Sequence, residues 1–416
     1  METWQRNLYA MVIVQFVMSI AFSTMTPFLP FFVQQLGVPH GSSVEVWSGL
    51  IFSANFLMAA ILSPYWGYLS DRLGRKPMVL RSTLAVAVFT AAMGFSQNVY
   101  ELLAARAIMG ALSGFSAAAT TLVATQAPRE RVGYSLGLLQ TGQVSGAVFG
   151  PLLGGLLSDW LGSYRYVFWV TGLLAFVATL LVVFMVQEHF VPAREASKRP
   201  SLFRSFATVA RERQLLPMFV VLFMGQLGIM SIAPVLTLYT ASLLGENHPH
   251  LGLLAGSAQA VTGIANAIAS PLIGRQSDRI GQKRVLIAAL IGAACFLAPQ
   301  GLVGSYPIFL GLRFGLGLML GGLLPSANAL VSKLAPPSMR GQAFGLTAST
   351  TFLGNFGGPL LGGFVSSAYG IPTMFLVTAF LLFANACWVL LAVPRLAPSP
   401  ARATSPLTQQ GKHLPQ

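Results

Sequence analysis

Long apolar stretches alternate with short polar segments along the whole chain. A helix needs about 20 residues to cross a hydrocarbon layer roughly 30 Å thick. Because lipid offers no partner to backbone N–H and C=O groups, each stretch must be a helix or a strand of a closed barrel, and continuous apolar runs favour helices. The pattern predicts twelve membrane-spanning helices, near residues 8–35, 46–69, 78–96, 100–124, 135–158, 165–187, 214–244, 250–274, 285–303, 306–331, 341–367 and 372–394.

Positive charges lie almost entirely in every second polar segment. Of the 25 Lys and Arg residues, 22 fall on one side of the membrane, Arg165 falls on the other, and Arg106 and Arg313 lie within spans. Because such loops are retained in the cytoplasm, we expect a multi-pass protein of the cell inner membrane with both termini cytoplasmic. This topology and attraction to anionic lipids explain the net charge of +14, so no nucleic-acid partner is expected.

The composition argues against several classes of protein and site. The chain is only 9% charged, whereas soluble proteins carry roughly 25% charged residues. Cys295 and Cys387 lie within apolar stretches, and the five His residues lie in loops or the tail, which is a poor arrangement for a metal site. The sequence has no nucleophile–base pair and no GxxxxGK[ST] phosphate loop. We therefore expect neither an enzyme nor a cofactor, metal or ATP-driven pump.

The second half of the chain repeats the first at an offset of about 207 residues. Five motifs recur in order: Pro27 with Pro234, Ser63–Pro64 with Ser270–Pro271, Gly67–Gly74 with Gly274–Gly281, Arg106–Gly114 with Arg313–Gly321, and Gly146–Gly155 with Gly354–Gly363. Six spans per half in the same orientation indicate a parallel repeat about an axis along the membrane normal. We expect an N-terminal six-helix bundle (1–187), a cytoplasmic linker (188–213), a C-terminal bundle (214–394) and a disordered tail (395–416).

Several of these motifs resemble those of a known transporter family. The segment Gly67-Tyr-Leu-Ser-Asp71-Arg72-Leu-Gly74-Arg75-Lys76 resembles the loop 2–3 signature of the major facilitator superfamily. The segments Gly146–Gly155 and Arg106–Gly114 resemble the span-5 and span-4 motifs of its drug:proton antiporters, and the whole chain is similar to bacterial multidrug efflux transporters. The resemblance implies an all-α major facilitator fold and an exporter that confers antibiotic resistance.

The loop signature also has a physical basis. Gly67 and Gly74 would let a tight turn join two spans, and Asp71 can accept hydrogen bonds from the N-terminus of a neighbouring helix. The resemblance implies that the loop latches the two halves in the outward-open state, although topology alone would also explain its basic residues. The expected gating residues are Gly67, Asp71, Arg72, Gly74, Arg75, Lys76, Asp278, Arg279 and Gly281.

Glycines four residues apart predict close helix contacts in the fifth and eleventh spans. Such a small-xxx-small face lets two helix backbones approach closely, and an adjacent proline bends its helix. We expect these helices to meet the eighth and second spans of the opposite half, although generic tight packing would use the same residues. The residues concerned are Gly146, Gly150, Pro151, Gly154, Gly155, Gly354, Gly358 and Pro359.

Arg106 lies inside the fourth span, where its charge costs at least ~2.5 kcal/mol and is by default functional. The resemblance implies a role in proton transfer, and snorkelling to the membrane surface is the alternative. Antiport needs a protonatable group, yet all eleven Asp and Glu residues lie in loops or near span ends. Glu101 is the proton-coupling partner that we name, and Glu45 and Asp159 are further candidates. Each of these three also fits a solvated carboxylate at the membrane surface.

The substrate cavity is expected between the halves near the midplane, and the resemblance places spans 1, 4, 7 and 10 around it. Three Met residues share one stripe of span 1 with Gln15 and Phe22, and soft Met suits promiscuous binding. A packing or lipid-facing stripe would show the same pattern. The candidate cavity residues are Gln15, Met18, Phe22, Thr121, Gln226, Met230 and Asn328. A cavity without acidic residues should accept neutral, lipophilic compounds and gives no reason to favour dications.

These features predict a monomeric secondary transporter that exports lipophilic, drug-like molecules across the bilayer in exchange for protons, by alternating access. Two alternatives stay open: a metabolite or sugar exporter of the same fold, and a membrane sensor that keeps the fold without transporting. The paired latch loops argue against the sensor, because a static protein has little use for two gates.

Overall fold

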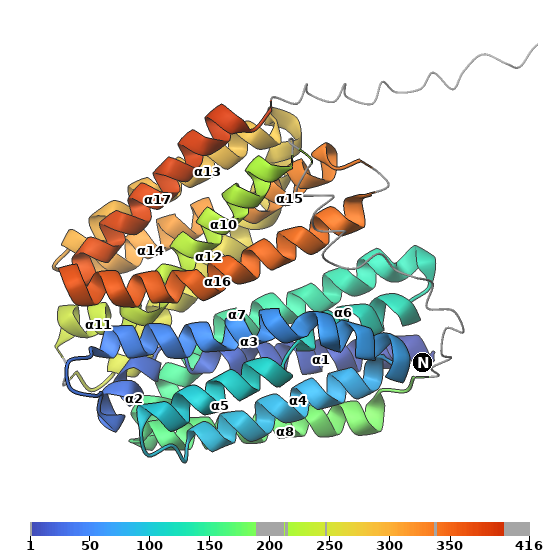
Figure 1. The fold of residues 1–416 in the computed structure, drawn as a ribbon, viewed down its shortest axis with the longest axis horizontal. Helices are drawn as coiled ribbons and strands as arrows, with labels where there is room; N and C mark the ends of the chain where they lie inside the picture. Colours follow the sequence, from blue (N-terminus) through green and yellow to red (C-terminus); the bar gives the residue numbers. More distant parts are fainter. Residues whose placement is uncertain (1, 189–211, 213–214, 246–247, 337–338, 395–416) are drawn as a thin grey trace, which may run out of the picture.

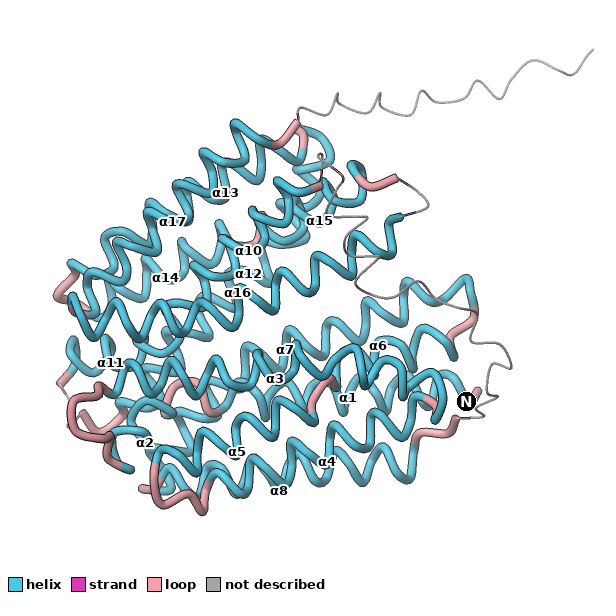
Figure 2. Tube along the Cα trace, viewed as in Figure 1, coloured by secondary structure: helices cyan, strands magenta, loops and turns pink. Residues whose placement is uncertain are grey.

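The computed structural model describes residues 2–188, 212, 215–245, 248–336 and 339–394. Helices and short connections make up these ranges, with no strand among them (Figure 2). The predicted tail, and the predicted linker apart from Glu188 and Glu212, lie outside the described residues, as do the side chains of Asp71 and Arg129.

The N-terminal half forms the first six predicted spans. Span 1 is α1 (Thr3–Thr24) and α2 (Leu29–Leu36), span 2 is α3 (Val44–Leu73), span 3 is α4 (Arg75–Met93), span 4 is α5 (Val99–Leu112) and α6 (Phe115–Gln126), span 5 is α7 (Val132–Leu161), which follows the short helix η1 (Arg129–Arg131), and span 6 is α8 (Tyr164–Met185).

The C-terminal half repeats this order (Figure 1). Span 7 is α10 (Leu216–Ser231) and α11 (Ala233–Leu244), span 8 is α12 (Leu251–Ile280), span 9 is α13 (Gln282–Leu297) with η2 (Ala298–Leu302), span 10 is α14 (Tyr306–Leu320) and α15 (Leu323–Leu334), span 11 is α16 (Arg340–Tyr369), and span 12 is α17 (Ile371–Ala392). The prediction of twelve spans in two parallel six-helix repeats is confirmed.

Spans 1, 4, 7 and 10 are each broken into two helices, which was not predicted. Pro27 lies in the break of span 1, and Pro234 is in the first turn of the second part of span 7. Proline favours a break at these places because it lacks the N–H that would continue the preceding helix. Span 4 breaks at Gly114, whose φ of 108° glycine adopts readily, and span 10 breaks at Gly321. The matched residues of each pair differ by 207, so both halves break the same spans at the same depth.

Eleven helical stretches in the described residues are long and apolar enough to cross a membrane. The remaining span, span 11, is α16, a 30-residue helix whose Gly, Ser, Thr and Asn residues lower its hydropathy. It packs between α10 of its own half and α3 of the opposite half (Figure 1). A helix that faces protein on both sides does not need a uniformly apolar surface, which explains why α16 falls short on composition.

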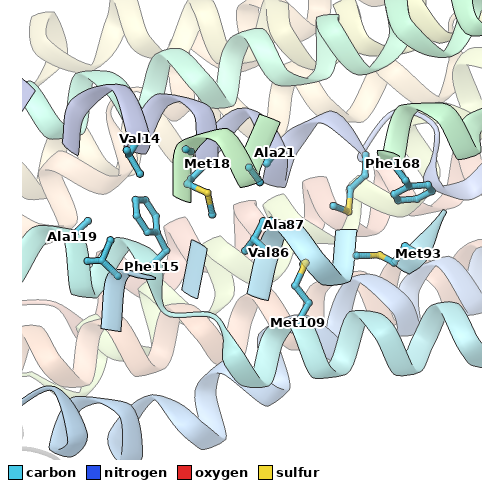
Figure 3. Close-up of a cluster of buried hydrophobic side chains, with 14 of the residues drawn as sticks. Val14, Met18, Ala21, Val86, Ala87, Met93, Met109, Phe115, Ala119 and Phe168 are labelled. Atoms are coloured by element: carbon cyan, nitrogen blue, oxygen red, sulfur yellow. The ribbon is translucent and has the colours of Figure 1, made fainter. Parts of the chain in front are cut away.

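Each half has its own hydrophobic core. In the N-terminal half, buried side chains of α1, α4, α5, α6 and α8 pack together, among them Met18, Met109 and Phe168 (Figure 3). In the C-terminal half, Phe309 and Phe375 belong to a separate core. Because the two cores are separate, the halves can move against each other as rigid bodies.

Candidate functional site

The two halves meet at one end of the molecule, which we call the outer end; the opposite end, with the basic loops, is the inner end. At the outer end α7 packs on α12 and α3 packs on α16. A β-carbon on Gly155 would overlap the carbonyl oxygen of Gly252, and one on Gly49 would overlap that of Pro359. Backbone therefore touches backbone across the halves, and we call these two contacts the outer gate. Toward the inner end, α16 and α3 diverge (Figure 1).

The glycine–proline segment of α7 makes contacts in two directions. Gly146, Gly150 and Gly154 pack against α1 of their own half, whereas Pro151 and Gly155 meet α12 of the opposite half. Each residue turns about 100° around a helix with 3.6 residues per turn, so the neighbour of a stripe residue faces a different helix. The predicted contact between spans 5 and 8 is confirmed. It is made by Pro151 and Gly155, each of which follows one of the repeated glycines.

The same division recurs in α16. Gly354 and Gly358 pack against α10 of their own half, whereas Pro359 and Gly363 meet α3 of the opposite half. A β-carbon on Gly363 would overlap the carbonyl region of Glu45. The predicted meeting of spans 11 and 2 is therefore confirmed as well.

Single glycines form the turns of the inner loops. Gly74 joins α3 to α4 and Gly281 joins α12 to α13, with φ values of 97° and 104° that other residues rarely adopt. The prediction of a tight turn is confirmed for both. The prediction that Gly67 shares in this turn is wrong, because α3 continues as a helix through Gly67 for nearly two more turns. A β-carbon at Gly67 would meet no atom within 4 Å, so packing does not require glycine there.

Lysine side chains tie each inner loop to the last helix of its own half. Nζ of Lys76 donates to the carbonyl oxygen of Val183 at 3.0 Å, and Nζ of Lys283 donates to that of Leu390 at 2.9 Å. Both lysines lie 107 residues before their acceptors. A cation is stabilised at a helix C-terminus, where unpaired carbonyl groups carry partial negative charge. These contacts anchor both loops in the same way.

The other predicted gating residues make local contacts where the structure describes them. The guanidinium of Arg72 lies 4.5 Å from the ring centre of Tyr68, and Nη1 of Arg75 donates to Oγ of Ser70 at 2.6 Å. Asp278 accepts a hydrogen bond from Gln282 at 3.0 Å, and Arg279 is exposed in the last turn of α12. Asp71 is in the last turn of α3, and its side chain lies outside the described residues. The latch between halves stays a prediction.

Glu188 caps the start of α4. Its two carboxylate oxygens accept hydrogen bonds from the backbone N–H groups of Arg75 and Lys76, at 2.8 and 2.6 Å. A carboxylate at this position satisfies free N–H groups and the positive end of α4. The end of span 6 is thus attached to the loop signature by a carboxylate as well as by the Lys76 contact.

Arg106 and Arg313 are buried at matching places in spans 4 and 10, with 3% and 7% of their surfaces exposed. Arg106 donates to the thioether sulfur of Met25, and its Nε has no hydrogen-bond partner among the described residues. Nε of Arg313 donates to the carbonyl oxygen of Ala258 at 3.2 Å. A side chain this buried does not snorkel. Glu101 is exposed and bonds to Gln97 at 2.8 Å at the outer start of its own helix, so these two predicted residues are not brought together.

A cavity of about 230 Å³ lies beside Arg313. Its walls come from α10, α11, α12, α13, α14 and α17, with Ala147 of α7 contributed by the opposite half. Its lining is mostly aliphatic, and its polar members are Arg313, Gln259, Thr262, Asn266 and Thr378. No carboxylate is among the described residues that line it. The cavity can therefore hold an apolar molecule and donate several hydrogen bonds to it.

The two halves differ at this place. Met25 reaches Arg106 in the N-terminal half, whereas its counterpart 207 residues later, Ile232, lines the cavity next to Arg313. The flexible Met side chain fills the space around its arginine.

Three of the predicted cavity residues lie in the C-terminal half. Met230 lines the cavity. Gln226 lies one turn earlier on α10 and donates to Asn355 of α16 at 2.7 Å. Asn328 is half-buried on α15, and its side-chain oxygen has no partner in the described part of the chain. The structure therefore brings one of the three to the cavity.

The other four lie in the N-terminal half, away from this cavity. Met18 is fully buried in the core against α4 (Figure 3), which matches the packing alternative for the Met stripe. Gln15 is buried and donates to Ser116 of α6 at 3.3 Å. Phe22 and Thr121 are half-buried. Their roles in substrate binding stay predictions.

Two charged residues have contacts that the sequence did not reveal. The guanidinium of Arg81 lies 3.5 Å from the ring centre of Trp66, and its Nη2 donates to the carbonyl oxygen of Ser113 at the break of span 4. The carboxylate of Asp159 accepts two backbone hydrogen bonds from α12. Arg81 lies almost two turns inside α4, and this depth is the signal that separates it from a loop charge.

Comparison with known proteins identifies close relatives. The profile described as Major Facilitator Superfamily matches residues 11–261 and 219–414. The chain is 42% identical over 386 residues to multidrug resistance protein MdtG of Rahnella sp. (strain Y9602), covering 92% of each protein. It is 41% identical over 404 residues to multidrug resistance protein MdtG of Klebsiella pneumoniae (strain 342), covering 97% of this chain and 96% of that one.

Solved structures show the same fold. The inward-facing, unoccupied structure of a bacterial homolog of the human lysosomal transporter Spinster aligns with a TM-score of 0.80 at 14% identity, covering 94% of this chain and 97% of that one. A point mutant of the nucleoside transporter NupG aligns with a TM-score of 0.77 at 14% identity, covering 92% of this chain and 99% of that one.

Proposed function

Because the chain belongs to the major facilitator superfamily, we propose that it exports drugs or other lipophilic small molecules by alternating access. The observation that carries this proposal is its similarity, over 92% of the chain or more, to proteins named multidrug resistance protein. Two separate cores and halves that meet at the outer end support it, because rocking of two such bodies exposes a central site to alternate sides. One chain contributes both halves, so a monomer suffices.

We place the protein in the inner membrane with both termini in the cytoplasm. The asymmetric distribution of Lys and Arg supports this orientation. The inner end then faces the cytoplasm, and the closed outer gate makes this structure an inward-facing state. In this state a molecule from the cytoplasm or inner leaflet can enter between the halves.

Drug resistance of cells that overproduce the protein tests this function. We propose the Arg313 cavity as part of the substrate site, and expect resistance to neutral lipophilic drugs to rise while that to dications stays unchanged. A dication beside a buried arginine without a carboxylate suffers like-charge repulsion of several kcal/mol, which corresponds to a preference of about a hundredfold or more for neutral compounds. Susceptibility and drug accumulation are measured with cells carrying the empty vector as control. Unchanged susceptibility to every drug would contradict the efflux proposal, and strong resistance to dications would contradict the cavity assignment.

We propose that export is coupled to inward proton movement and that Arg106 takes part. We expect Arg106→Gln to reduce substrate-induced proton movement in proteoliposomes about tenfold or more, because an arginine this deep in a span is retained for function. Arg131→Gln, which alters an exposed arginine at the start of α7, is the matched control. Equal proton movement by both variants would show that Arg106 takes no part in proton coupling. Substrate transport without any proton movement would contradict the antiport proposal but not the efflux proposal. Glu101→Gln in the same assay tests the second predicted residue.

We propose that the two inner loops close against the opposite half in the outward-facing state. Asp71 and Asp278 lie at the inner ends of α3 and α12, where closure would bring the halves together. The Lys76 and Lys283 contacts support this role, because a gating loop must move as one body with its own half.

A further inference from the structure

The carboxylate of Asp159 crosses the outer gate. Asp159 lies on the outer end of α7, in the N-terminal half. Its Oδ1 accepts a hydrogen bond from the backbone N–H of Gly252 at 2.9 Å, and its Oδ2 accepts one from Leu253 at 2.8 Å. Both donors belong to the first turn of α12, in the C-terminal half. A β-carbon on Gly252 would collide with Asp159 and Ser158, so glycine is required for this close approach.

The first turn of α12 has no cap of its own. Its N-cap residue is His250, whose side chain makes no capping hydrogen bond. At the matching helix of the other half, Ser43 caps α3 by accepting from the backbone N–H of Val46 at 3.3 Å. Free N–H groups at a helix start need an acceptor, and Asp and Ser side chains serve well. The helix α3 thus carries its cap in its own sequence, whereas α12 receives its cap from the opposite half.

The second contact of the outer gate lacks such a carboxylate. At an offset of 208, the position of Asp159 on α16 is occupied by Ser367, which is exposed. The outer gate is therefore asymmetric. A charge-assisted pair of hydrogen bonds joins α7 to α12, whereas α16 and α3 are joined by backbone packing and by one uncharged hydrogen bond from Oγ of Ser53 to the carbonyl oxygen of Phe356 at 2.7 Å.

We propose that Asp159 is a gating residue of the export cycle, which holds the outer gate closed by capping α12 across the two halves. Opening the gate removes the carboxylate and leaves the first turn of α12 without a side-chain cap, so the contact favours the inward-facing state. Export requires that this contact break once in each cycle. The inference rests on the proposed function, because it assumes that the halves move as alternating access requires.

The distance between the outer ends of the halves tests the proposal. Spin labels at Phe95→Cys and Leu302→Cys suit this measurement, because both positions are exposed at the outer ends of spans 3 and 9 and differ by 207. The native cysteines, Cys295 and Cys387, are free and exposed, so they are replaced by alanine in every sample. Pulsed electron paramagnetic resonance of the full chain in lipid nanodiscs then gives the ratio of outer-open to outer-closed molecules.

We expect Asp159→Ala to raise this ratio about tenfold, because a helix cap and its charge are both lost from the closed state. Asp159→Asn should give an intermediate ratio, since its amide oxygen accepts a hydrogen bond without the charge. Ser367→Ala is the matched control at the other contact and should leave the ratio unchanged. An unchanged ratio in both Asp159 variants would overturn the proposal.

His250→Ser supplies a second test that leaves Asp159 in place. A serine at this position gives α12 its own cap in both states. The Asp159 cap then stabilises the closed state much less, and the ratio of outer-open to outer-closed molecules should rise. In a protein that already carries Asp159→Ala, His250→Ser should change the ratio little further. A double-mutant cycle would report this as strong coupling between the two positions. Full additivity of the two substitutions would overturn the proposal. If the wild type confers resistance but no ratio moves, this inference alone fails; if it confers none, the proposed function fails whatever the ratios show.

Discussion

Cells that produce a Gly155→Val variant are expected to lose drug export although the protein still folds. The backbone of Gly155 touches that of Gly252 across the two halves, and a β-carbon would overlap the Gly252 carbonyl oxygen. The halves can relieve this overlap by separating at the outer end, so the variant folds but cannot close its outer gate. A transporter held open to the outside cannot load substrate from the cytoplasm, and we expect at least about a tenfold loss of export.

Gly137→Val on the same helix is the matched control. A β-carbon at Gly137 would meet no atom within 4 Å, so it carries the same change in helix propensity without a collision. Drug accumulation, membrane abundance and the temperature of unfolding are measured for both. Normal export by Gly155→Val would show that the gate closes without this backbone contact. If valine prevents production of the protein, Gly155→Ala supplies the smaller obstruction.

Gly154→Val, one residue earlier, is expected to destabilise the protein itself. A β-carbon on Gly154 would overlap the carbonyl oxygen of Thr24 on α1, which belongs to the same half. Movement of the two halves cannot relieve this overlap, because both helices belong to one rigid body. Overpacking of this kind costs on the order of 1–3 kcal/mol, occasionally more.

The temperature at which purified protein loses its monodisperse state in size-exclusion chromatography measures this effect. Gly154→Val should lower that temperature clearly, while Gly155→Val and Gly137→Val should stay near the wild type. Equal temperatures for Gly154→Val and the wild type would contradict the division of contacts between neighbouring residues of α7. The two adjacent glycines would then have no separate roles.

Much of the fold could be read from the sequence, because membrane insertion imposes simple physical requirements. The length of apolar stretches gave the spans, and the spacing of matched motifs gave the two halves. The breaks in spans 1, 4, 7 and 10 escaped, because a broken helix buried among others keeps the same hydropathy as a continuous one. Gly114 and Gly321 carried a local signal for these breaks, but glycine is so frequent in this chain that the signal was not distinctive.

The candidate site was harder to predict because it depends on which helix face meets which neighbour. Met18 lies on a stripe that suits either a cavity or a core, and only the positions of α4 and α8 decide between them. Asp159 was recognised as an outer carboxylate, but its partners are backbone N–H groups of a distant helix, and backbone groups leave no trace in the sequence. The cavity beside Arg313 is lined by residues from seven helices, and the sequence alone does not show that these residues come together.

The two lysine contacts of the inner loops also bear on how the chain is made. Lys76 and Lys283 each reach the end of the sixth span of their own half. A ribosome delivers the chain from its N-terminus, and domains generally fold as units in that order. We therefore expect the Lys76 contact of the first bundle to form once α8 has been synthesised, before the second bundle enters the membrane. On this view the two bundles fold one after the other, and the contacts of the outer gate between them form last.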